Sequence, residues 1–314
     1  MNRMTKTMWE LGLLFLITIS VVVGSSTITL SDSFKHRPTP TWTNLDVPGA
    51  MGTYAFGINS QGNIVGQYQS KVNEYHSYLL RNGVLTNIDP PGSDNSAGDG
   101  AAADINDAGA IVGRYKSGQD NMVHGFLLHK GNFATIDPPG SVYTEAAGIN
   151  PRGEIVGLYF LADGSYHGFH LYKGALTTID YPDPSAMGTI VAAINPDGKM
   201  VGWYDDASGI SHSFLLSEGV FTTFDFPGAA GTLVFGINAS GEIIGSSVDN
   251  LGGFHGFLLR KGRFTTIDPP GSVWTRVTGI NSIGDIVGGY LDADGVLHGF
   301  LRREGEHCRD GFRQ

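Results

Sequence analysis

The chain has 314 residues, of which 46 are glycine and only 16% are charged, and its formal net charge at pH 7 is −10. This glycine content is roughly twice that of average proteins and is typical of many short strands joined by tight turns. Nucleic-acid binding relies on clustered Lys and Arg that displace counterions, so the acidic balance argues against a nucleic-acid partner.

Residues 1–26 are expected to be an export signal. Arg3 and Lys6 precede an apolar run from Leu11 to Gly24. A run of this length suits a secretory signal, whereas a membrane-spanning helix needs roughly 20 apolar residues. An uncleaved anchor is the alternative, because no clean small-x-small cleavage site follows the run. Residues 27–40 are then a linker, and the mature protein is expected to be secreted, periplasmic or at the cell surface, with no membrane span.

One sequence pattern recurs six times in the rest of the chain. It reads G-I-N-x-x-G-x-I-V-G-x-Y and then H-G-F-L-L-x-x-G-x-F-T-T-I-D-x-P-G. Its Asn residues are Asn59, Asn106, Asn150, Asn195, Asn238 and Asn281, at spacings of 43 to 47 residues. This period matches four-stranded β-propeller blades, and the richness in β-branched residues, aromatics and Gly excludes helical repeats of similar length. Two copies read Asn-Pro-x-Gly, which favours a type I turn, so the six Asn residues are interpreted as turn formers.

The second half of each repeat is predicted to form a hairpin that pairs a His with an Asp. In five repeats the His precedes the Asp by thirteen residues and an x-Gly dipeptide lies midway, as in His124, Lys130-Gly131 and Asp137. If the dipeptide forms a two-residue turn, the His and the Asp lie opposite each other on one face of the hairpin. A bulge would slide this pairing by one residue. The residues given this structural role are His76, His124, His167, His212, His255, His298, Asp46, Asp89, Asp137, Asp180, Asp225 and Asp268.

The sixth repeat contains His298 but lacks the F-T-T-I-D strand that should follow it. The segment Trp42–Gly49 matches that strand and precedes the first repeat. An N-terminal strand that completes the last sheet explains both observations, whereas an open solenoid would leave unpaired edges. We therefore predict an all-β, six-bladed β-propeller with four-stranded blades over residues 41–306. A tail, residues 307–314, follows and holds Cys308, the sole cysteine, so the chain cannot form an internal disulfide.

The repeats resemble those of the bacterial HAF extracellular repeat proteins. The resemblance rests on the H-G-F and H-S-F tripeptides together with G-I-N-x-x-G-x-I-V-G. The resemblance covers nearly the whole mature chain. The family has Ala in the middle of the tripeptide, whereas this chain has Gly, as in His124-Gly125-Phe126, or Ser, as in His212-Ser213-Phe214, and the first copy drifts to His76-Ser77-Tyr78. All of these middle residues are small. The resemblance implies an exported repeat protein and adds no assigned activity.

The chemistry-bearing residues give little sign of a metal site or of catalysis. One His per blade places the imidazoles around a ring and not around one ion, so neither a metal nor a cofactor is expected. The segment Asp292–Gly295 resembles the start of a calcium loop but lacks the later ligands, so it is interpreted as a hairpin turn. No G-x-S-x-G nucleophile elbow occurs. An exported hydrolase or lyase with an active site at the channel mouth stays as the alternative, because fold does not decide function.

Residues that differ between repeats are the candidates for function, because the shared ones build the blades. Between each P-G and the next G-I-N, the chain passes from an outer strand to the next inner strand, and such connections line the mouth of a propeller channel. Exposed aromatics beside Glu and Arg there would suit a sugar or a peptide; the alternative is that they plug the channel or pack between blades. The predicted binding residues are Tyr54, Tyr143, Glu145, Trp274 and Arg276.

Two further departures from the repeat occur near the same connections. An acidic insertion runs from Asp94 to Asp99, and Asp104 replaces the Gly that precedes Ile-Asn in four of the other repeats.

The leading hypothesis for function is a monomeric, non-enzymatic scaffold that binds a carbohydrate or a surface protein through one face of the ring.

Overall fold

The structure is a computed structural model that describes residues 20–23, 26–29, 39–96 and 98–304. The chain divides into two compact units, Met1–Pro38 and Thr39–Gln314. In the first unit, β1 (Ser20–Val23) pairs antiparallel with β2 (Ser26–Thr29). Most of the predicted signal and linker, and the tail with Cys308, lie outside the described residues. Within the described ranges, no helix has the length and apolar character needed to span a membrane.

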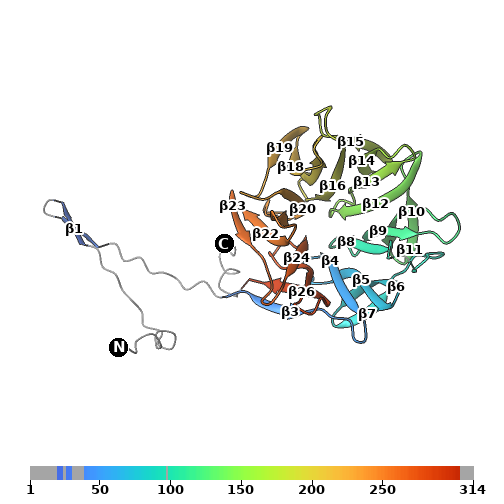
Figure 1. The fold of residues 1–314 in the computed structure, drawn as a ribbon, viewed down its shortest axis with the longest axis horizontal. Helices are drawn as coiled ribbons and strands as arrows, with labels where there is room; N and C mark the ends of the chain where they lie inside the picture. The colour runs from blue at the N-terminus through green and yellow to red at the C-terminus, as the bar shows by residue number, and fades with distance from the viewer. Residues whose placement is uncertain (1–19, 24–25, 30–38, 97, 305–314) are drawn as a thin grey trace. The chain divides into compact units, whose positions relative to one another are not determined.

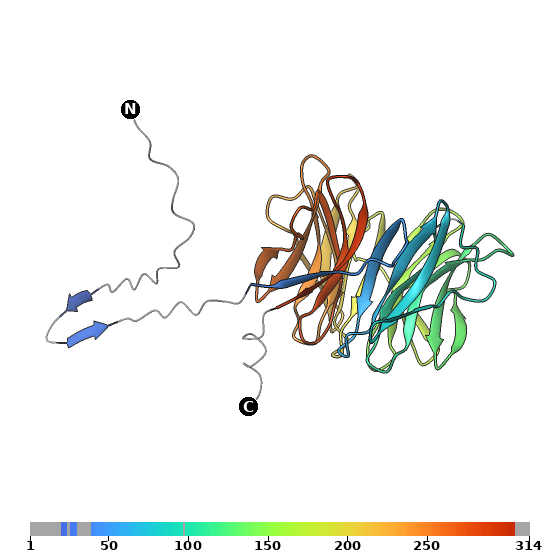
Figure 2. The same cartoon turned by 90° about the horizontal axis from the view of Figure 1, so that it is seen from below.

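The second unit is all β, and its 24 strands form six four-stranded groups arranged around a common axis (Figures 1 and 2). We call these groups blades one to six, in chain order. Within each of blades one to five the strands pair antiparallel with their neighbours in sequence, and blade six pairs in the same way except for its outer strand. A repeat of about 45 residues therefore supplies one blade, as its period predicts.

The strand bounds follow the repeat closely. Blade one comprises β4 (Gly52–Ile58), β5 (Ile64–Lys71), β6 (Glu74–Arg81) and β7 (Val84–Asn87). Blade two comprises β8 (Ala101–Ile105), β9 (Ile111–Lys116), β10 (Val123–His129) and β11 (Asn132–Ile136). Blade three comprises β12 (Ser141–Ile149), β13 (Ile155–Leu161), β14 (Tyr166–Tyr172) and β15 (Ala175–Ile179).

The later blades repeat this order. Blade four comprises β16 (Gly188–Ile194), β17 (Met200–Asp205), β18 (Ser211–Ser217) and β19 (Val220–Phe224). Blade five comprises β20 (Gly231–Ile237), β21 (Ile243–Val248), β22 (Phe254–Arg260) and β23 (Arg263–Thr266). Blade six comprises β24 (Trp274–Ile280), β25 (Ile286–Leu291), β26 (Leu297–Arg303) and β3 (Thr41–Asn44).

Blade six takes its outer strand from the N-terminal side of the unit. β3 pairs antiparallel with β26, with Asn44 opposite Phe300 and Thr41 opposite Arg303. The ring of Trp42 packs edge-on against Phe300 at 5.4 Å. The N-terminal strand therefore occupies the place that the sequence assigned to it. Elsewhere neighbouring blades share little backbone pairing: single parallel bridges join blades two, three and four, and the sheets do not form one hydrogen-bonded ring.

The hairpin between the third and fourth strands has the predicted two-residue turn. In blade two, Lys130 and Gly131 have φ values of 51° and 80°, and His129 pairs with Asn132 on either side of them. Positive φ at both central residues is the mark of a type I′ turn. The same turn occurs at Asn82, Lys173, Glu218 and Lys261, each followed by Gly. The register that the His–Asp pairing needs is therefore present.

Each blade packs around one aromatic ring that lies on a glycine. The rings are at most 1% exposed and belong to Tyr78, Phe126, Phe169, Phe214, Phe257 and Phe300. In blade three, a Cβ at Gly157 would lie 1.9 Å from the Glu145 carbonyl oxygen and 2.7 Å from the Phe169 ring. The Gly of I-V-G and the aromatic residue of H-x-F recur together because the ring occupies the space that a side chain at the Gly would need.

Candidate functional site

The innermost strand of every blade borders the axis, and all six run in the same direction along it. These strands are β4, β8, β12, β16, β20 and β24. They begin at the end that we call the mouth and finish in the Asn-x-x-Gly turns at the other end, which we call the Asn end. Each inner strand carries a bulge just before its turn, as between Ala55 and Gly57 in β4. The two ends therefore differ in chemistry and are considered in turn.

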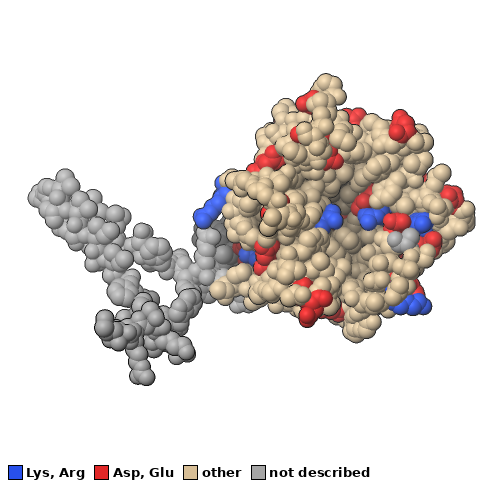
Figure 3. Space-filling model, in the orientation of Figure 1, with Lys and Arg blue, Asp and Glu red and all other residues tan. Residues whose placement is uncertain are grey.

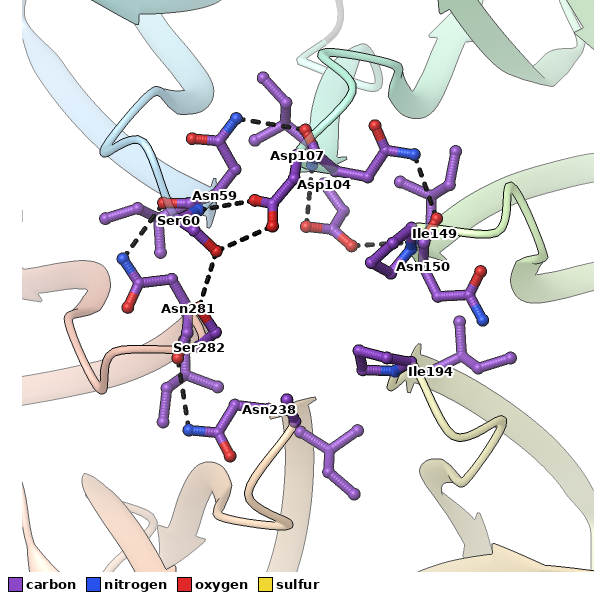
Figure 4. A pocket seen from close by; sticks show the side chains of 18 residues that line it. Asn59, Ser60, Asp104, Asp107, Ile149, Asn150, Ile194, Asn238, Asn281 and Ser282 are labelled. Carbon is purple, nitrogen blue, oxygen red and sulfur yellow. Dashed lines mark hydrogen bonds between the residues drawn. The ribbon is translucent and has the colours of Figure 1, made fainter. Parts of the chain in front are cut away.

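The six repeated Asn residues form a closed ring of hydrogen bonds at the Asn end. Figure 4 shows the part of this ring that runs from Asn238 through Asn281 and Asn59 to Asn150. Each side-chain Nδ2 donates to the backbone carbonyl of the Asn in the next blade, at 3.1 to 3.4 Å, and Asn281 returns to Asn59. Each Oδ1 accepts backbone N–H groups of its own turn, such as those of Arg152 and Glu154 on Asn150. The Asn residues are therefore turn formers, as interpreted from the sequence, and their side chains also join each blade to the next.

The ring surrounds a small pocket of about 90 Å³ that opens to solvent. Asp104 lies in its wall and accepts hydrogen bonds from the backbone N–H groups of Ile105 at 2.8 Å and Ile149 at 2.9 Å. Burial raises the pKa of Asp104 to about 6, although these two donors act to lower it. Asp107 accepts from the Ser60 N–H and hydroxyl, and that hydroxyl meets Ser282 at 2.7 Å. The carboxylates of the pocket therefore already have partners in the protein.

At the mouth, one group of predicted residues gathers where blade six meets blades five and one. The guanidinium of Arg276 lies 4.2 Å from the centre of the Phe235 ring. The ring of Trp274 packs against Phe254 at 5.7 Å and against Tyr54 at 6.4 Å. The Tyr54 hydroxyl is directed at the Arg276 carbonyl oxygen, 3.5 Å away. Burial raises the pKa of Tyr54, so its phenol is neutral.

A second group gathers where blade three meets blade two. Glu145 forms an ion pair of 2.6 Å with Arg114 of β9. The Tyr143 hydroxyl donates to Glu145 at 3.4 Å, and its ring packs edge-on against Phe160. Burial raises the pKa of Tyr143, and the neighbouring Glu145 charge raises it further. The carboxyl group of Glu145 therefore lies between the Arg114 guanidinium and the Tyr143 hydroxyl.

The two groups lie on opposite sides of the mouth. Glu145 is four residues before Ile149 in β12, and Arg276 is four residues before Ile280 in β24, so they occupy equivalent positions in blades three and six. Figure 1 shows β12 and β24 across the axis from each other. In the described residues, the contacts that these side chains make stay within each group. The five predicted residues thus share one end of the axis but form two clusters.

The structure corrects two details of the prediction. The five residues belong to inner strands β4, β12 and β24 and not to the connections before them. They are also less open than expected: Tyr54 is 9% exposed, and the other four are partly buried. Tyr54 thus fits the alternative in which an aromatic residue packs between blades. The prediction missed Arg114, Phe235 and Phe254. An alignment of channel-facing alternate positions in the inner and second strands would have found Arg114 and Phe235, whereas Phe254 begins the third strand, β22.

Figure 3 shows the mouth face of the ring. Basic side chains lie near the hollowed centre of this face, whereas most acidic side chains lie toward its rim. The acidic insertion borders this face: Asp94 donates its N–H to the Lys116 carbonyl, and Gln67 binds the Gly98 carbonyl at 3.0 Å. The centre of the mouth is therefore more positive than the net charge of the chain suggests.

On the outside of the ring, every repeated His binds its predicted Asp. The Nδ1-to-carboxylate distances are 2.7 to 3.0 Å in the six blades. In five blades a second acid, which the sequence reasoning missed, lies near Nε2: Glu74, Asp120, Asp206, Asp249 and Asp292. The Asp292 carboxylate also accepts the N–H groups of Asp294 and Val296, so the calcium-like segment forms a hairpin turn. Across the described residues, no three His, Cys, Asp or Glu side chains are grouped as metal ligands would be.

Comparison with known proteins relates the fold to solved structures. No protein-family model and no curated protein matches the sequence. AofleA from Arthrobotrys oligospora is 12% identical, with a TM-score of 0.51 over 85% of this chain and 87% of that chain. A mutant Aleuria aurantia lectin in complex with Fucα1-6GlcNAc is 12% identical, with a TM-score of 0.51 over 82% of this chain and 93% of that chain. A putative TolB from Agrobacterium tumefaciens is 12% identical, with a TM-score of 0.54 over 80% of this chain and 89% of that chain.

At this level of identity the likeness concerns the fold alone. The chain is therefore an all-β protein with a propeller-like fold, and its function has to be argued from its own residues.

Proposed function

We propose that this protein is a carbohydrate-binding propeller whose saccharide site is the mouth. The observation that carries the proposal is that the two sides of the mouth each combine partly buried aromatic rings with a charged group. Trp274 and Phe254 accompany Arg276 on one side, and Tyr143 accompanies Glu145 on the other. Aromatic faces stack on the apolar faces of sugars, and nearby charged groups bind hydroxyls. All of these side chains stand on strands, which hold a site more rigidly than loops do.

The fold comparison supports this proposal. The Aleuria aurantia structures that resemble this chain hold Fucα1-6GlcNAc or α-methyl-L-fucoside, so a propeller of this kind can serve as a lectin. The proposal includes a closed six-bladed ring, which β3 and the Asn ring support. It also keeps the expected export and the HAF-like character of the repeats, which would place the site outside the cytoplasm.

Binding without turnover fits the mouth better than hydrolysis does. Glycoside hydrolysis uses two carboxyl groups, one of which must be protonated to act as the acid. The carboxyl group of Glu145 is taken up by an ion pair of 2.6 Å with Arg114. A mouth with this arrangement is suited to holding a sugar and not to protonating a leaving group.

Glycan-array binding and calorimetric titration of the purified protein test this proposal. Saturable binding of a saccharide that Trp274→Ala weakens at least tenfold would support it. Tyr172→Ala is the matched control, because Tyr172 is a partly buried aromatic on the hairpin of blade three, next to Lys173. Binding that both variants leave unchanged would move the site away from the mouth, and release of a cleaved product would favour a hydrolase.

A further inference from the structure

Arg276 differs from Arg114, the arginine on the opposite side of the mouth, because it has no acidic partner among the described residues. Arg114 is held by Glu145 at 2.6 Å. For Arg276, neither an ion pair nor a side-chain hydrogen bond occurs with any described residue, and its buried Nε is unsatisfied. A buried donor without a partner costs free energy, so proteins rarely keep one without a use.

The surroundings of Arg276 stabilise its charge without neutralising it. Its guanidinium lies on the face of Phe235, whose ring is buttressed edge-on by Trp203 at 5.4 Å. A cation over an aromatic face is attracted by the ring quadrupole, which offsets part of its lost hydration. The Tyr54 phenol, which is directed at the Arg276 carbonyl, is neutral because burial raises its pKa. A full positive charge is therefore available at the mouth, held over the Phe235 ring.

We propose that Arg276 is an anion subsite that recognises the carboxylate of an acidic saccharide, such as a uronic acid residue. This inference rests on the proposed carbohydrate-binding function and specifies its ligand class. A guanidinium presents its N–H donors as a planar fork that matches a carboxylate, and a charge-assisted pair in a partly buried site is stronger than a neutral hydrogen bond. The Trp274 ring, on the same strand two residues away, is placed to contact the sugar that bears the carboxylate.

The charge distribution agrees with this ligand. The chain carries a net charge of −10, which alone would repel an acidic sugar. Most acidic side chains lie toward the rim of the mouth face, and several basic ones lie near its hollowed centre (Figure 3). Because salt screens charges beyond roughly 8–10 Å, the ligand would respond chiefly to the charges nearest to it in the mouth.

The test is isothermal titration of the full chain with three oligosaccharides of equal length: neutral glucose-type, glucuronic-acid-containing and sulfated. The expected result is that the uronic-acid ligand binds at least tenfold more tightly than the neutral one, and that Arg276→Gln weakens it roughly 10- to 100-fold. Arg276→Lys should restore only part of the affinity, because lysine keeps the charge and loses the fork. Arg152→Gln, which removes an exposed arginine at the Asn end, should change nothing.

Each of the other outcomes would overturn one or both of the proposals. Equal binding of neutral and acidic ligands that still depends on Trp274 would overturn the anion subsite and leave the carbohydrate proposal standing. Preference for the sulfated ligand over the uronic acid would overturn the carboxylate assignment. If no saccharide binds while the variants melt at the wild-type temperature, both proposals fail together.

Discussion

The Nδ1 atom of His298 lies 2.9 Å from the carboxylate of Asp46, although 252 residues separate the two in the chain. The contact reproduces in blade six the pair that other blades form between residues thirteen apart, such as His124 and Asp137. It follows from β3, which brings the N-terminal segment beside β26. The first strand of the ring is therefore an integral part of its last blade.

Deleting residues 1–46 should destabilise the protein far more than deleting residues 1–38. The longer truncation removes β3, leaves the outer edge of β26 unpaired and uncovers Phe300, against which Trp42 packs. Loss of a large aromatic contact in a core costs about 3–5 kcal/mol, and somewhat less here because Trp42 is only partly buried. Thermal and urea denaturation of both truncated proteins would measure the difference. Equal stability would show that blade six holds together without its outer strand.

Gly157→Ala should destabilise the protein by roughly 1–3 kcal/mol, because the added Cβ would collide with a backbone oxygen and with Phe169. Gly231→Ala is the control, since the nearest atom to a Cβ there is 3.8 Å away. Urea unfolding of both variants would compare them. Equal effects would mean that the collision at Gly157 is relieved by movement of the strands.

The contribution of the Asn ring can be separated from that of its turns by Asn150→Asp. Aspartate keeps the oxygen that accepts from Arg152 and Glu154 and loses the donor to the Asn195 carbonyl. We expect a loss of about 1–3 kcal/mol in the free energy of unfolding, because a buried carbonyl loses its partner. Asn150→Ala removes both functions and should cost more. If the Asp variant is as stable as the wild type, the ring bonds contribute nothing.

Stability should fall as the pH rises above about 6.5, the usual pKa of histidine. Hydrogen bonds to Asp225 and Asp268 raise the pKa of His212 and His255 above that value. For His124 and His298 burial lowers the pKa, and the flanking carboxylates outweigh it, so the net shift is also upward. A group with a raised folded-state pKa stabilises the fold fully below the unfolded pKa and loses that effect as pH rises through the folded value.

Chemical denaturation between pH 5.5 and 8.5 would measure this slope, and replacing these four His residues with Gln should flatten it. Asp104 titrates in a lower pH range. Burial raises its pKa in the folded protein to about 6, so stability should fall as the pH rises from about 4 to about 6. Asp104→Asn should therefore alter the slope only in that lower window. A slope above pH 6.5 that survives the His replacements would assign it to other groups.

The repeat predicted the fold well because it determines what one blade needs. Lys130-Gly131 marks a type I′ turn, and the turn fixes the register that brings His124 to Asp137. The strand that is missing after His298 and the extra strand around Trp42 together located the closing strand. In each case, residues that are close in sequence or repeated in every blade were enough to determine the local geometry.

The candidate site was harder to predict because it depends on which blades are neighbours and which side chains face the axis. Tyr54 was expected to be exposed, yet the Gly289 backbone of blade six leaves room for its ring, and it packs there. The pairing of Arg114 with Glu145, which leaves Arg276 alone, joins side chains from different blades. The Asn ring escaped notice for the same reason, although an amide in all six copies, with no Asp or Ser, was a usable signal.

The origin of β3 also sets an order of events during biosynthesis. β3 is among the first strands to be made, but its partner β26 ends 259 residues after Asn44, at Arg303. At synthesis rates of about 5–20 residues per second, β3 would wait roughly 10–50 s for its partner. During that time five blades can form one after another, while the strand that completes the sixth stays unpaired. The last hydrogen bonds of the ring can thus form only when nearly the whole chain has emerged.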